Sequence, residues 1–176
     1  MPGFDGAPMA QVLKAARARG ATTSLDTVWD ATGSWMETLG PCLEHTQVFL
    51  PSLAEAQELT GRQSPADVAE ALLDAGVEVV GLKMGPEGSY VAAGDQRVTA
   101  PAYQIDAVDG TGAGDAYVAG FLSAWLDGWD LERTARFANA VGALCTTGLG
   151  TTAGVRSREG TLAFLREREP GCWSDL

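Results

Sequence analysis

Histidine and paired cysteines are nearly absent from this sequence. Its 176 residues include one histidine, His45, which leaves no histidine pair for a zinc site and no spare histidine for Ser–His–Asp catalysis. The three cysteines, Cys42, Cys145 and Cys172, have no C-x-x-C spacing, so neither a zinc knuckle nor a thioredoxin-type redox pair is indicated. A reducing cytoplasm is the simplest compartment for such a set.

Positive charge is scarce as well. Twelve Lys and Arg residues stand against 23 Asp and Glu residues, a net charge of −11, which disfavours binding to nucleic acid or to anionic membranes. No uncharged apolar run reaches the roughly 18 residues that cross a bilayer, and the N-terminus lacks the pattern of a signal peptide. The hydrophobic fraction of 45% is ordinary for a folded protein, and the length suits one domain with its own core.

The chain alternates between helix and strand patterns. Apolar spacing and caps predict helices over residues 8–19, 53–60, 65–74, 115–127, 131–147 and 157–168. Short β-prone runs predict strands over residues 21–26, 47–50, 77–84, 89–93 and 97–103. The stretch 27–46 is mixed, and Trp29, Trp35 and Met36 are expected to pack there. This order predicts an α/β fold with a mainly parallel sheet covered by helices, as a single domain.

A glycine-rich loop, Asp109–Asp115, leads directly into an apolar helix. Three glycines in this loop let the backbone turn tightly and approach a ligand closely. The unpaired amides at the helix start, with the helix dipole, favour an anion. A carboxylate at Asp115 would oppose plain anion binding, but it suits a base that accepts a proton during phosphoryl transfer.

Other interpretations of this loop stay open. The sequence has no G-x-x-x-x-G-K-[ST] motif, and position 115 is Asp where a G-x-G-x-x-G loop needs Gly, which disfavours a P-loop protein and a Rossmann dehydrogenase. The alternative without catalysis is a plain helix start, with Asp115 in the first turn because of the helix dipole.

Several motifs together resemble one family. The run DGTGAGD at 109–115, followed by AYVAGFLSAW, resembles the D-[ST]-[ST]-G-A-G-D signature of the PfkB (ribokinase-like) carbohydrate kinases. Residues 24–26, 50–61, 82–89 and 138–154 resemble further segments of that family, in its order. The resemblance implies a ribokinase-like three-layer α/β/α fold with a mainly parallel sheet.

The resemblance also assigns catalytic roles, position by position. Asp115 would be the base that removes the proton from a sugar hydroxyl. The amides of Gly112, Ala113 and Gly114 would form an anion hole for the transferred phosphoryl group.

Metal and nucleotide contacts follow from the same resemblance. Glu55 would organise Mg²⁺ and its waters, while Asp109 and Thr111 would lie where many members bind a monovalent cation, commonly K⁺. The residues expected to contact ATP, along its phosphates or at its adenine, are Lys83, Gly85, Gly88, Asn139, Ala143 and Gly150.

Simpler roles are open for Glu55, for Lys83 and for Asp26, whose strand resembles the one that ends in Asp near the sugar–phosphate cleft of the family. Ser52 and Glu55 form the S-x-x-E pattern of a capping box, which can coexist with a metal role. Lys83 could be a solvated lysine at a strand end, and Asp26 a turn or cap residue.

The sequence also departs from the family pattern. Gly110 replaces a hydroxyl residue of the loop signature, and Ser52 replaces the Asn of the N-x-x-E motif. Residue 1 matches the middle of the usual fold, so residues 1–176 are expected to be its C-terminal part, without the N-terminal strands and the β lid that supply most sugar contacts.

Three functions are therefore compared. The first is an ATP-dependent sugar kinase of the cytoplasm, whose sugar and hydroxyl position the sequence does not identify. The second is a truncated, non-catalytic nucleotide-binding fragment that needs a partner, with homo-oligomers formed through an exposed sheet edge. The third is a nucleoside or vitamin kinase of the same superfamily.

Overall fold

The computed structural model describes residues 6–174, and its contacts divide the chain into two compact units. The first unit runs up to Lys83 and adds Tyr90–Arg97. The second unit holds Met84–Ser89 and the described chain from Val98 onward. Within residues 6–174, no helix is long and apolar enough to cross a bilayer.

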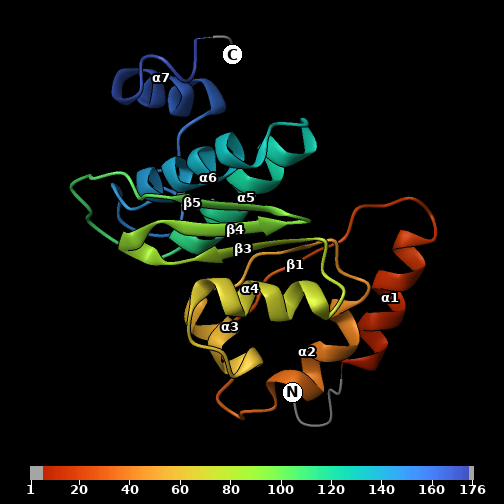
Figure 1. Ribbon diagram of the computed structural model, residues 1–176. Helices are drawn as coiled ribbons and strands as arrows, with labels where there is room; N and C mark the ends of the chain where they lie inside the picture. Colours follow the sequence, from red (N-terminus) through yellow and green to blue (C-terminus); the bar gives the residue numbers. More distant parts are fainter. Residues whose placement is uncertain (1–5, 175–176) are drawn as a thin grey trace. The chain divides into compact units, whose positions relative to one another are not determined.

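The first unit contains the helices and parallel strands of the N-terminal part of the chain (Figure 1). Its helices are α1 (Ala7–Arg17), α2 (Trp35–Leu43), α3 (Leu53–Thr60) and α4 (Pro65–Asp74). Its strands are β1 (Ser24–Leu25), β2 (Val48–Phe49) and β3 (Val79–Lys83), together with most of β4 (Ser89–Ala93) and the start of β5 (Gln96–Ala100).

The strands form one sheet in the order β1-β2-β3-β4-β5. β1 pairs in parallel with β2, and β2 with β3, so that Leu25 lies opposite Phe49 and Phe49 opposite Val80. Because these three strands run the same way, the residues that follow them gather at one edge of the sheet.

Helices α3 and α4 contact β3 and enclose an apolar core with it. Phe49, Val68, Leu72 and Leu82 are all buried in this core. Local sequence sets the helix boundaries: Ser52 caps α3 with a full capping box, and Ser64 caps α4 ahead of Pro65.

The second unit is mainly helical. It contains the short 3₁₀ turn η1 (Gly85–Glu87) and the helices α5 (Ala113–Leu126), α6 (Leu131–Cys145) and α7 (Arg158–Arg168). Helices α5 and α6 lie side by side in Figure 1 and contact each other extensively. Phe137, Leu144, Leu165 and Trp173 are buried in the core of this unit.

The structure confirms most predicted elements and corrects one stretch. Residues 35–43 form α2, although the sequence pattern predicted no helix there, because Gly40 and Pro41 are poor helix formers. Burial of Trp35 and Leu43 outweighs that local preference. Trp29 and Met36 were expected to pack but are 56% and 49% exposed, although the Trp29 ring contacts Trp35 edge-on.

Four of the five predicted strands are longer than the observed ones, and the fifth, over 89–93, matches β4. β1 spans Ser24–Leu25 where 21–26 was predicted, and β5 ends at Ala100 where the prediction continued to 103. Pro101 explains the second difference, since proline has no amide hydrogen to donate to a neighbouring strand. Helix α5 begins at Ala113, two residues earlier than predicted.

Candidate active site

In the first unit, polar residues gather after the parallel strands. We call Asp26, Thr27, Ser52, Glu55 and Lys83 the strand-end cluster. Asp26 and Thr27 follow β1, Ser52 and Glu55 belong to the start of α3 after β2, and Lys83 ends β3. A parallel bridge between Ser52 and Lys83 extends the pairing of their strands by one further step. The structure therefore brings together two residues predicted to handle Mg²⁺ and phosphate, Glu55 and Lys83.

Lys83 is held by Asp26. Its Nζ donates to both carboxylate oxygens of Asp26, at 2.8 and 2.7 Å, and the two side chains are 15% and 24% exposed. Burial raises the pKa of the Asp26 carboxyl above its ordinary value, and nearby Glu55 adds to this, while Lys83 acts in the opposite direction. Lys83 is thus an ion-paired, mostly buried lysine rather than the solvated one that the sequence left open.

Glu55 has two differently used oxygens. Oε2 accepts from the Ser52 amide at 3.0 Å, the Ser52 hydroxyl at 2.7 Å and the Thr27 hydroxyl at 3.0 Å. Among residues 6–174, nothing hydrogen-bonds or forms an ion pair with Oε1. The capping box is therefore present, and one oxygen is still available to a ligand.

The strand-end cluster fits Mg²⁺ that is bound together with nucleotide phosphates, and it does not fit a metal ion enclosed by protein side chains alone. The described residues contain no group of three or more His, Cys, Asp or Glu side chains that could enclose a metal ion. Mg²⁺ bound to nucleotide phosphates keeps several waters and uses one or two carboxylates, and Glu55 offers one such oxygen.

In the second unit, the loop 109–115, which we call the glycine loop, is anchored by its first residue. Asp109 accepts from the amide and hydroxyl of Thr111, at 2.9 and 2.7 Å, and from the amide of Gly150 at 2.8 Å. These hydrogen bonds, the one from the Thr111 amide foremost, lower the pKa of the Asp109 carboxyl. Asp109 and Thr111, predicted for a cation site, and Gly150, predicted for nucleotide contact, thus form one contact group.

The glycine loop sits closely on the chain that follows α6. The amides of Val108 and Asp109 both donate to the carbonyl of Thr146, at 2.7 and 3.1 Å. Gly112 has φ +81°, and a Cβ there would lie 2.5 Å from the carbonyl oxygen of Thr151. A side chain at position 112 would therefore both strain the backbone and displace that segment.

The helix start offers free donors. Ala113 donates to the carbonyl of Gly110 at 3.2 Å, but within the described chain no acceptor bonds the amides of Gly112 and Gly114. No side chain caps α5, and the exposed Asp115 stands in its first turn. Unpaired amides beside an exposed carboxylate are the combination predicted for an anion hole with a base.

Cys145 lies under this loop. Its thiol contacts the carbonyls of Thr151 and Thr111, with Sγ 3.2 and 3.9 Å from the two oxygens. Burial raises the thiol pKa, and the charges of Asp109 and Asp115 add to this. This environment is typical of a buried, unreactive thiol.

The remaining residues predicted for nucleotide contact differ in their freedom. Asn139 is 7% exposed, and its amide nitrogen donates to the carbonyls of Ala100 and Pro101, at 2.9 and 3.1 Å. The carbonyl of Ala143 accepts from the amide and hydroxyl of Thr146. Gly85 has open space around it. Gly88 is buried, and a Cβ at this position would collide with the carbonyl oxygen of Ala100.

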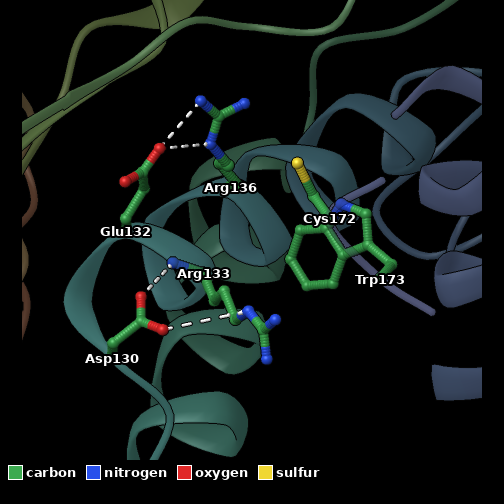
Figure 2. Close-up of a pocket in the computed structure, with 6 residues that line it drawn as sticks. All are labelled: Asp130, Glu132, Arg133, Arg136, Cys172 and Trp173. Carbon is green, nitrogen blue, oxygen red and sulfur yellow. Dashed lines mark hydrogen bonds and ion pairs between the residues drawn. The ribbon is translucent and has the colours of Figure 1, made fainter. Parts of the chain in front are cut away.

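A pocket in the second unit is lined by none of the predicted site residues. It has a volume of about 190 Å³ (Figure 2). Its lining comes from the start of α6 and the C-terminal segment: Asp130, Glu132, Arg133, Arg136, Cys172 and Trp173. Arg136 forms ion pairs with Glu132 at 2.9 Å and with Glu169 at 2.8 Å. These ion pairs indicate a structural role for the side chains around this pocket.

Sequence reasoning missed the partners of the predicted residues. Thr27 and Thr151 carried no motif signal, and Asp26 was noted without its link to Lys83. The one available hint was the expectation that residues following parallel strands share an edge of the sheet.

The α/β fold, the mostly parallel sheet and the glycine loop at a helix start agree with the ribokinase-like fold that solved structures share with this chain. The family model "pfkB family carbohydrate kinase" matches residues 2–158, and the chain belongs to this family.

Relatives and solved structures agree with that assignment. The 2-dehydro-3-deoxygluconokinase of Bacillus subtilis is 31% identical over 160 residues, covering 88% of this chain and 49% of that protein. A ribokinase from Arabidopsis thaliana, solved with ribose and ATP, has a TM-score of 0.79 and 27% identity, covering 89% of this chain and 51% of that one. A double-mutant fructokinase from Vibrio cholerae O395, solved with fructose, ADP and a potassium ion, also has a TM-score of 0.79, with 26% identity over 89% of this chain and 54% of that one. The chain thus spans about half the length of the curated relatives it matches.

Proposed function

We propose that this chain transfers the γ-phosphate of ATP to a hydroxyl group of a sugar, with Asp115 as the base. The observation that carries this proposal is the start of α5, where the exposed Asp115 follows amides of Gly112 and Gly114 that no acceptor among residues 6–174 bonds. Membership of a carbohydrate kinase family supports the choice of a sugar as the acceptor.

The proposed reaction moves one proton and one phosphoryl group. The Asp115 carboxylate accepts the proton of the sugar hydroxyl, and the freed oxygen forms a bond to the γ-phosphorus. The bond from that phosphorus to the β,γ-bridging oxygen breaks, and ADP leaves. The amides of Gly112, Ala113 and Gly114 stabilise charge that develops on the transferred group, although the Ala113 amide is partly engaged with Gly110.

The strand-end cluster supports the proposed nucleotide contacts. Lys83, which is paired with Asp26, would place its positive charge along the phosphates. Glu55 Oε1 would hold Mg²⁺ that is bound together with the nucleotide. Bound Mg²⁺ neutralises phosphate charge. Gly85 and Gly88 shape the turn beside the phosphates, and Asn139, Ala143 and Gly150 border the adenine. For Asn139 the role is indirect, since its amide nitrogen already holds Ala100 and Pro101.

The proposed monovalent cation site at Asp109 and Thr111 has little spare capacity. A carboxylate has about four acceptor positions, and Asp109 uses three of them within the protein. Asp109 therefore orders the loop first, and K⁺ would take one carboxylate contact at most. Replacing K⁺ by Na⁺ in the activity assay tests this contact.

The direct test of the function is sugar-dependent release of ADP. The purified chain is incubated with ATP, Mg²⁺ and, in turn, ribose, fructose or 2-dehydro-3-deoxygluconate, with adenosine and pyridoxal as contrasting acceptors. Release with one sugar and not with the contrasting acceptors supports the proposal and names the acceptor. Release only with adenosine or pyridoxal would replace it by a nucleoside or vitamin kinase.

A second candidate is nucleotide binding without transfer, in concert with a partner. It is considered because the matches to two curated sugar kinases cover 45% and 49% of those proteins. ATP binding by calorimetry, with no ADP released for any acceptor, would support this function over the first.

The three cysteines are free, which agrees with the proposed cytoplasmic location.

A further inference from the structure

The hydrogen bond between Thr27 and Glu55 is not explained by helix capping. In the capping box of α3, the Ser52 amide donates to Glu55 Oε2 and the Glu55 amide donates to Ser52 Oγ, while the Ser52 hydroxyl also donates to Oε2. Thr27 Oγ1 donates to the same Oε2 at 3.0 Å from a position 28 residues earlier in the chain. The helix start is complete without this third donor, so the contact from Thr27 acts on Glu55 itself.

The position of Thr27 is itself fixed by the ion pair next to it. The Thr27 amide donates to Asp26 Oδ1 at 2.8 Å, and the same carboxylate binds Lys83. The Lys83 amide in turn donates to the carbonyl of Pro51 at 3.0 Å, directly before Ser52. Thr27 therefore closes a ring of contacts that joins the ends of β1, β2 and β3.

The effect of the ring is to make the two oxygens of Glu55 unequal. Three donors hold Oε2, which leaves a single carboxylate orientation favoured, and Oε1 has no partner among residues 6–174. A ligand bound at Oε1 would meet an oxygen that is already oriented, and such preorganisation by outer partners strengthens metal binding.

We infer that Thr27 is a positioning residue, whose hydroxyl orients Glu55 so that Oε1 serves Mg²⁺ bound with the nucleotide. This inference rests on the proposed function, which gives Glu55 its metal role. Thr27 touches no reacting atom in it.

The test measures the free Mg²⁺ concentration that half-saturates the enhancement of ATP binding by this chain. Thr27→Val keeps the shape of the side chain and removes the hydroxyl, whereas Thr27→Ser keeps the hydroxyl. Outer partners of a metal ligand change affinity by about 10-fold or more. We expect Thr27→Val to raise the half-saturating Mg²⁺ by about 10-fold, with ATP binding in EDTA unchanged, and Thr27→Ser to stay within about 2-fold of the natural chain.

Two companion variants separate the possible failures. Glu55→Gln should raise the Mg²⁺ requirement, and adding Thr27→Val to it should change nothing further. If Mg²⁺ does not enhance ATP binding by the natural chain, or if Glu55→Gln leaves the half-saturating Mg²⁺ concentration unchanged, the metal role of Glu55 fails and the inference fails with it. If Glu55→Gln has its effect but Thr27→Val does not, only the role of Thr27 is overturned.

A purely structural role for Thr27 is also distinguishable. In that case Thr27→Val lowers the thermal unfolding midpoint but leaves the Mg²⁺ dependence as it is, which overturns the inference. Should Thr27→Val fold poorly, Thr27→Ala removes the hydroxyl without adding an apolar γ-methyl at a partly buried position, and the same Mg²⁺ shift is expected.

Discussion

The strand-end cluster presents charged side chains, whereas the glycine loop presents mainly backbone amides. The cluster is built from ionised side chains that are largely withdrawn from water, namely Asp26, Glu55 and Lys83. The loop is built from backbone: amides at a helix start, Gly112 with no room for a side chain, and an aspartate that anchors the turn. Burial raises the pKa of Asp26, whereas hydrogen bonds from the loop lower that of Asp109.

The difference shows how each region tolerates change. A backbone-built site loses its shape when a Cβ is added, but it depends little on any single charge. A side-chain-built site depends on partners, because removal of one member leaves the other buried and unpaired.

The largest expected effect comes from Asp115→Asn. Asp115 is the side chain of the loop that is proposed to accept the proton of the sugar hydroxyl. Loss of a general base costs about 10²- to 10⁴-fold in rate. We expect sugar-dependent ADP release to fall by that amount, with ATP affinity kept, as measured by a coupled assay and calorimetry. Asp106→Asn, an exposed acid of the preceding segment, is the matched control and should retain full activity. Equal activity of both variants would remove Asp115 from the mechanism.

Gly112→Ala tests the dependence of the loop on backbone shape. The residue has φ +81°, and the added Cβ would lie 2.5 Å from the Thr151 oxygen. We expect a loss of about 1–3 kcal/mol in the free energy of unfolding, measured with urea. Gly110→Ala is the control on the same loop, since nothing lies within 4 Å of its Cβ, and it should cost less than about 0.5 kcal/mol. Equal costs would show that the loop is not shape-limited at Gly112.

Lys83→Met tests the dependence of the strand-end cluster on pairing. It leaves Asp26 without its partner in a partly buried place, and we expect a loss of about 1–3 kcal/mol in the free energy of unfolding, below the fully buried case because some solvent reaches the pair. The double variant with Asp26→Asn should cost less than the sum of the two single variants. Glu70→Gln, which removes an exposed partner of Arg97, should cost under about 1 kcal/mol. If Lys83→Met lowers the free energy of unfolding by no more than Glu70→Gln does, the ion pair between Lys83 and Asp26 is not important for stability.

The smallest expected effect is a difference in the pH dependence of unfolding. Asp109 has a lowered pKa, so its contribution to stability is present above the ordinary value of 3.8 and is lost as pH falls through the folded-state pKa. Asp26 has a raised pKa, so its contribution is present below 3.8 and is lost as pH rises through the folded-state pKa. The stability difference between the natural chain and Asp109→Asn should therefore grow with rising pH near 4, and that for Asp26→Asn should shrink. Slopes of the same sign would contradict the contrast between the two regions.

Local patterns predicted the elements well where short-range interactions decide them. The capping box at Ser52 and the Ser-Pro start at residue 64 place α3 and α4 correctly. Helix α2 escaped prediction because Gly40 and Pro41 oppose a helix locally, while the burial of Trp35 and Leu43 favours it through contacts distant in sequence. The same reason hid the bond from Thr27 to Glu55, which spans 28 residues.

The sequence by itself determined the family, the positions of the caps and the glycine loop with Asp115, because each depends on residues only a few positions apart. The tertiary structure alone decided that Asp26 neutralises Lys83, that Glu55 keeps one oxygen without a partner in the part of the chain that the structure describes, and that Asp109 binds Gly150. Such pairings depend on burial and on distances of about 3 Å between residues far apart in the chain, which the parallel strand ends and the packed helices impose.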